Sequence, residues 1–122
     1  EAAETMLRQA LRLLEQEENP RNRADAIVDV ATAQAQLDQP GYEATFDLAG
    51  AAIDQIDQAH SRAHAMCNLA EHMSRAGLHA KTHELLAEAD AVAHEIPEPD
   101  LQQQTVQRIR KLMGELPKPK AG

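Results

Sequence analysis

The sequence repeats itself at a spacing of 39 or 40 residues. With Arg62 aligned to Arg23, small and apolar residues coincide along the following turns. The matched pairs are Ala24 and Ala63, Ala26 and Ala65, Ile27 and Met66, Val30 and Leu69, Ala31 and Ala70, Phe46 and Leu86, Ala49 and Ala89, and Ile56 and Ile96. A fixed period of this length is typical of arrays in which one small supersecondary unit is stacked on the next.

Helix-breaking residues divide the chain into six segments, and in each segment the apolar residues recur at helical spacing. The breakers include Asn19-Pro20, Gln39-Pro40-Gly41, Gly77 and Pro97 with Pro99. Aromatic residues make up only 2% of the chain, so its apolar content is largely Ala and Leu, which favour helices. The predicted helices cover residues 3–18, 22–37, 42–56, 62–76, 80–95 and 100–116, with Ser61 and Asp100 as N-caps.

The period and the helices together predict one all-α repeat domain over residues 1–116. Its first helix (3–18) is half a repeat, followed by full repeats over 22–56 and 62–96 and a terminal helix over 100–116. We call the first helix of each full repeat its A helix and the second its B helix, so the order is B, A-B, A-B, A. Short connections make neighbouring helices antiparallel. A closed helical bundle is the alternative, and residues 117–122 are predicted to be a disordered tail.

The best-preserved repeat resembles the tetratricopeptide (TPR) family. Its A helix reads Met66-x-x-Leu69-Ala70-x-x-Met73, and its B helix reads Thr82-x-x-x-Leu86-x-x-Ala89. The resemblance implies an α-solenoid of antiparallel helical hairpins. In the terminal helix Arg110 stands where the family has a small residue, which suits an outer face that no further helix covers.

Charge and composition exclude several classes of function. The formal net charge is -8, whereas a nucleic-acid-binding domain usually carries a basic patch. No apolar run is long enough to span a bilayer, and no signal-peptide pattern is present. A single Cys rules out an internal disulfide framework. We therefore expect an acidic cytoplasmic domain, part of a larger protein, that binds neither nucleic acid nor membrane.

One helix carries side chains that could hold a metal. His64, Cys67 and Glu71 share a face of the fourth helix, and His60 would join them one turn earlier. These residue types ligate zinc, but structural zinc sites usually draw ligands from two short motifs, and no second Cys exists. A solvated surface is the favoured interpretation. With no phosphate loop and no nucleophile motif, we expect no cofactor and no enzymatic activity.

The resemblance to the TPR family implies a partner-binding groove lined by A helices. The implied function is a non-catalytic protein-protein interaction module that binds a peptide or a helix in that groove. The groove residues carried over from the family are Asp25, Val28, Thr32, Gln36, His64, Cys67, Glu71, Arg75, Gln104, Gln107 and Lys111.

Two other functions stay open. The first helix is apolar over a wide arc, since Leu13 adds to Leu7, Ala10, Leu11 and Leu14. It predicts either weak homodimerisation through this helix or a preceding A helix that covers it. The helices would then serve as a self-association or intramolecular scaffold. A metal sensor or metal-dependent enzyme built on the four candidate ligands is the least favoured alternative.

Overall fold

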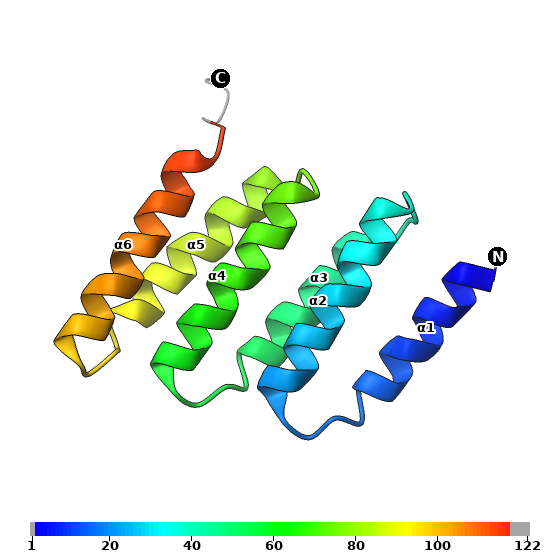
Figure 1. The fold of residues 1–122 in the computed structure, drawn as a ribbon, viewed down its shortest axis with the longest axis horizontal. Helices are drawn as coiled ribbons and strands as arrows, with labels where there is room; N and C mark the ends of the chain where they lie inside the picture. Colours follow the sequence, from blue (N-terminus) through cyan, green and yellow to red (C-terminus); the bar gives the residue numbers. More distant parts are fainter. Residues whose placement is uncertain (1, 118–122) are drawn as a thin grey trace. The chain divides into compact units, whose positions relative to one another are not determined.

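The computed structural model describes residues 2–117, with side chains described from Thr5 onward. This part of the chain is all-α, as predicted, and contains six helices and no strand (Figure 1). The helices are α1 (Ala2–Leu14), α2 (Pro20–Gln36), α3 (Tyr42–Ile53), α4 (Ala59–Arg75), α5 (His79–Ala93) and α6 (Pro99–Glu115). None of the described helices combines the length and the apolar character that crossing a bilayer requires. Beyond residue 117, the predicted tail lies outside the described residues.

The helix boundaries recur with the period of the sequence. The A helices α2, α4 and α6 each have 17 residues and begin at Pro20, Ala59 and Pro99. The helices α1, α3 and α5 end at Leu14, Ile53 and Ala93. Equivalent residues of successive repeats therefore occupy the same place along their helices.

The A helices begin one to three residues earlier than predicted, at Pro20, Ala59 and Pro99. Asn19 is the N-cap of α2, where its Oδ1 accepts from the backbone N–H of Arg21 at 2.9 Å and of Asn22 at 3.2 Å. Proline then stands in the first turn, where the helix needs no amide donor. Pro20 and Pro99 thus begin helices rather than only separating them. The predicted N-caps Ser61 and Asp100 are wrong, because both residues lie within the first turn of a helix.

The helices form two compact units, which divide after Ile56. In the first unit, α2 packs against both α1 and α3. In the second unit, α4 packs against α5, and α6 packs against both of them. The pairs α2–α3 and α4–α5 are the helical hairpins of the two full repeats.

Small residues occupy the centre of each hairpin. Ala31 and Ala49 are completely buried in the first unit, and Ala70 and Ala89 are completely buried in the second. These are the positions at which the repeat places alanine in both copies. A side chain of one carbon lets two helix backbones approach closely, so larger neighbours such as Phe46 can fill the space above and below.

A polar side chain one turn inside each A helix makes polar contacts outside its own helix. In α2, the Arg23 guanidinium donates to the backbone oxygen of Glu17 at 2.6 Å and to Gln55 Oε1. At the equivalent position of α4, Arg62 pairs with Glu95 at 3.3 Å. Since Gln55 and Glu95 are themselves equivalent, the two full repeats make the same contact between their A helix and the end of their B helix.

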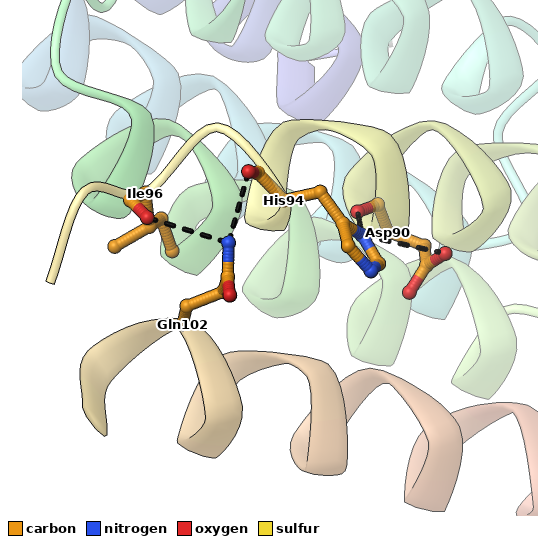
Figure 2. A network of polar contacts seen from close by, with 4 residues as sticks. All are labelled: Asp90, His94, Ile96 and Gln102. Carbon is orange, nitrogen blue, oxygen red and sulfur yellow. Dashed lines mark hydrogen bonds and ion pairs between the residues drawn. The ribbon is translucent and has the colours of Figure 1, made fainter. Parts of the chain in front are cut away.

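The terminal helix fastens its loop with an amide instead of a guanidinium. Gln102, equivalent to Arg23 and Arg62, donates from Nε2 to the backbone oxygens of His94 at 2.9 Å and Ile96 at 3.4 Å (Figure 2). His94 also contacts Asp90, whose backbone oxygen lies 2.7 Å from His94 Nδ1. Both Arg23 and Gln102 thus reach a backbone carbonyl six residues earlier, which holds the incoming chain against the helix start.

The α2 and α4 helices end in the same left-handed turn with different residues. After α4, Gly77 has a φ of 87° and the Leu78 N–H donates to the Met73 carbonyl at 3.0 Å. After α2, Asp38 takes the equivalent place with a φ of 52°, and the Gln39 N–H donates to the Gln34 carbonyl at 2.9 Å. This Schellman arrangement favours glycine, which has no Cβ to strain it.

Replacing Asp38 by glycine should therefore stabilise the first unit. We expect the free energy of unfolding to rise by about 0.5–1 kcal/mol in Asp38→Gly, because the left-handed strain is relieved. The reverse change, Gly77→Asp, should lower it by a similar amount. Urea denaturation of the two variants measures both effects, and a destabilised Asp38→Gly protein would contradict this account of the turn.

Two buried leucines test the packing of the second unit. Leu69 and Leu86 are only 2% and 0% exposed, so both belong to the core. Truncation of either one to Ala should cost about 2–5 kcal/mol of unfolding free energy, through lost contacts and a residual cavity. Leu37→Ala is the control, because Leu37 is 56% exposed and should change stability by less than about 0.5 kcal/mol. Losses that small at Leu69 and Leu86 would refute the packing.

Candidate interaction surface

On α2, most of the predicted groove residues are accessible. Asp25 and Gln36 are exposed, and Thr32 is partly exposed. Val28 is the exception, because only 6% of it is exposed and it belongs to the core. The prediction of Val28 as a groove residue is therefore wrong.

On α4 and α6, all but one of the predicted groove residues reach the surface. His64, Arg75, Gln104, Gln107 and Lys111 are exposed, and Glu71 is partly exposed. We call these six residues, together with Asn68 and Arg108, the α4–α6 surface. The remaining prediction, Cys67, is wrong as a groove residue because Cys67 is 0% exposed. Its burial reflects the position of α4, which packs against α5 and α6 and so buries more than one face.

Arg108 of α6 is the centre of this surface. One guanidinium nitrogen, Nη1, lies 3.1 Å from His64 Nδ1. The other, Nη2, donates to Asn68 Oδ1 at 3.0 Å and to Glu71 Oε1 at 3.2 Å, the latter an ion pair. The three acceptors follow one face of α4 over two turns. Arg108 thereby fastens α6 to α4 with its planar fork of donors.

Arg108 and Asn68 were not predicted from the sequence, although the repeat contains a signal for their contact. Arg108 lies 40 residues after Asn68, which is one period of the repeat. Equivalent positions on neighbouring A helices meet when the repeats stack, so a cation one period away from a polar side chain predicts a contact.

Cys67 lies beneath this polar cluster. Burial raises the pKa of the Cys67 thiol, the nearby Arg108 charge lowers it, and the Glu71 carboxylate raises it. The net direction is upward, so the protonated thiol is favoured at neutral pH. A protonated and buried sulfur is a poor nucleophile and a poor metal ligand.

The four candidate metal ligands do not form a metal centre. Within residues described by the structure, no group of three or more His, Cys, Asp and Glu side chains is arranged to hold a metal ion. His60 is exposed, whereas Cys67 is buried, and the Glu71 carboxylate pairs with Arg108. What the arrangement supports is a polar surface fixed by hydrogen bonds.

A pocket of about 260 Å³ opens beside the polar cluster, between the C-terminal parts of α4 and α6. Leu86 and Thr82 of α5 contribute to its lining, and the Thr82 hydroxyl is occupied by a hydrogen bond to the Leu78 carbonyl at 2.7 Å. The lining also includes Glu71, Arg75 and Glu115, so the pocket combines apolar walls with charged side chains. The full lining is Ala70, Glu71, Ser74, Arg75, Thr82, Leu86, Leu112, Glu115 and Leu116.

Comparisons with known proteins identify a structural neighbour but no family. No family model and no curated protein matches the sequence. A crystal structure of Ton1535 from Thermococcus onnurineus NA1 superposes with a TM-score of 0.75 at 18% sequence identity. The match covers 88% of this chain and 31% of the neighbour, so this chain spans less than a third of that protein's length. The likeness supports the all-α fold.

The Arg108 cluster should contribute measurably to stability. We expect Arg108→Ala to lower the free energy of unfolding by about 1–2 kcal/mol, because three acceptors on α4 lose their donor at a site only partly open to solvent. Arg110→Ala is a matched control on the same helix, where the side chain is exposed, and should change stability by less than about 0.5 kcal/mol. Equal effects of the two substitutions would show that the cluster does not fasten the helices.

Proposed function

We propose that the protein is a cytoplasmic, non-catalytic interaction module with TPR-like repeats, part of a larger protein, that binds a peptide on the α4–α6 surface. The observation that carries the proposal is the pocket between α4, α5 and α6, which opens beside exposed polar residues of two A helices. The lone buried thiol of Cys67 suits a reducing compartment.

The size of the pocket favours a peptide side chain over a small-molecule ligand. Its volume of about 260 Å³ lies below the range of roughly 300–1,000 Å³ that is usual for small-molecule and cofactor sites. Leu86, Leu112 and Leu116 provide an apolar lining that suits an aliphatic or aromatic side chain. The rest of the peptide would then lie over the exposed polar residues of the surface.

The charges around the pocket indicate what should flank this anchor residue. Glu71 is already paired with Arg108, so its carboxylate is partly neutralised. Arg75 and Glu115 line the same pocket with opposite charges, and both are exposed. An acidic residue next to the apolar anchor could pair with Arg75, which would fix the direction of the peptide more than it would add affinity.

The proposal predicts a common sequence pattern among selected peptides. Selection from a phage-displayed random peptide library against the immobilised protein should enrich peptides with a large apolar residue beside Asp or Glu. Synthetic copies, titrated by isothermal calorimetry, should bind at least about tenfold more weakly to Arg75→Glu and to Ser74→Trp, which reverses the rim charge and fills the pocket.

Two controls separate binding from folding. Arg12→Glu on α1 makes the same charge reversal at an exposed position of the first unit and should leave binding unchanged. Thermal denaturation should give all three variants nearly the wild-type midpoint, since the substituted side chains are exposed or partly exposed. Glu71 is unsuitable for this test because its substitution also breaks the ion pair with Arg108. Failure to enrich any pattern, or equal binding by all variants, would contradict the proposal.

A further inference from the structure

A pocket of about 370 Å³ opens within the first unit, between α1, α2 and α3. Its volume falls within the range of roughly 300–1,000 Å³ that is usual for small-molecule sites. Ile27 and Ala52 are each only 4% exposed and form its most buried lining, whereas Leu48 is 46% exposed. With Leu11 and Ala51, they give the pocket an apolar lining that comes from all three helices. The apolar body of a small ligand would be removed from water there.

The polar residues of this pocket gather at one of its ends. They are Glu15, Arg23 and Gln55, and each stands four positions along the chain from an apolar lining residue. Because connected helices run antiparallel, the end of α1, the start of α2 and the end of α3 lie at the same end of the unit. The pocket therefore has an apolar interior beside a polar end, which suits an amphipathic small molecule.

Arg23 brings to this polar end a positive charge that its own contacts leave uncompensated. The guanidinium donates to the backbone oxygen of Glu17 at 2.6 Å and to Gln55 Oε1, and both of these acceptors are uncharged. Among the described residues, no carboxylate forms an ion pair with Arg23. A guanidinium also has more N–H donors than these hydrogen bonds use. Both its charge and its remaining donors favour an anionic group in the pocket.

The second repeat shows how the same charge is compensated elsewhere in the chain. Its equivalent arginine, Arg62, pairs with the carboxylate of Glu95 at 3.3 Å. In the first repeat, the uncharged Gln55 takes the place of Glu95, and Leu48 takes the place of Glu88. The second repeat thus carries two carboxylates where the first carries an amide and a leucine. An apolar interior beside an uncompensated cation is therefore a property of the first repeat.

We propose that this pocket binds a small monocarboxylic acid with an aliphatic body, in its ionised form. The carboxylate accepts hydrogen bonds from the Arg23 guanidinium, whose planar set of donors matches two carboxylate oxygens. The aliphatic body lies against the apolar lining around Ile27 and Leu48. Glu15 also lines the polar end, and its negative charge disfavours a dianion such as a phosphate monoester. A ligand with a single negative charge is the one that fits.

Octanoate is the probe that tests the proposal on the intact protein. Titration into wild-type protein that is isotope-labelled at its Leu and Ile methyl groups should give saturable NMR shift changes at Leu11, Ile27 and Leu48. The neutral analogue octanamide should bind at least about tenfold more weakly, because it cannot form charge-assisted hydrogen bonds with Arg23. Octyl phosphate in its dianionic form should also bind more weakly than octanoate.

The decisive variant is Gln55→Glu, which gives the first repeat the carboxylate that the second repeat already has. The new carboxylate should pair with Arg23 and weaken octanoate binding by at least about tenfold, because the cation is then compensated within the protein. The melting midpoint should stay at or above that of the wild type, since the substitution copies an existing contact. Glu95→Gln makes the reverse exchange in the second unit and is the matched control, which should leave octanoate binding unchanged.

A second variant tests the apolar part of the pocket. Leu48→Glu copies Glu88 of the second repeat and should weaken octanoate binding by at least about tenfold, because a negative charge then faces the ligand. Ala87→Glu introduces the same carboxylate at an exposed position of the second unit and should have no effect. Both substituted side chains are exposed, so both variants should retain the wild-type circular dichroism spectrum.

Four results would overturn the proposal. Octanoate might give no saturable shift changes at the methyl groups of the pocket, or octanamide might bind as tightly as octanoate. Octanoate affinity might be unchanged in Gln55→Glu. Finally, the shift changes might be confined to methyl groups of the second unit, in which case octanoate would occupy the pocket beside Leu86 instead.

Discussion

Close packing of paired helices through alanine is the interaction on which the rest of the structure depends. Ala31 and Ala49 in one hairpin, and Ala70 and Ala89 in the other, have no exposed surface. A larger side chain at any of these positions would separate the helices and open gaps around the neighbouring residues. The chain has few aromatic residues, so it builds its core from small and medium side chains that must fit closely.

The polar contacts of the protein serve this packing at two levels. Within each full repeat, the arginine near the start of the A helix reaches the end of the B helix and fixes the two helices lengthwise. Between successive A helices of the second unit, Arg108 joins α6 to α4 through three acceptors. The contact of Arg23 recurs one period later at Arg62, and Arg108 lies one period after its acceptor Asn68. The repeat therefore organises the polar residues as well as the core.

The three B helices differ in how much of their apolar surface other helices cover. Helices α3 and α5 bury their apolar faces against α2 and α4, whereas α1 exposes Met6 and Leu13. At the other end of the chain, α6 carries Arg110 where an A helix of a full repeat carries alanine. The first and last helices are therefore chemically unlike, because α1 exposes apolar side chains and α6 exposes a charged one.

The sequence by itself determined the helical class, the number of helices and the register of the repeat, because these depend on local spacing and on matches along the chain. It did not place Cys67 and Val28 in the interior, because a periodic pattern shows which face of a helix is apolar but not how many neighbours that helix has. The contacts of Arg108 with α4 and the pocket beside Leu86 were decided by the tertiary structure, since both require side chains from separate helices to converge in space.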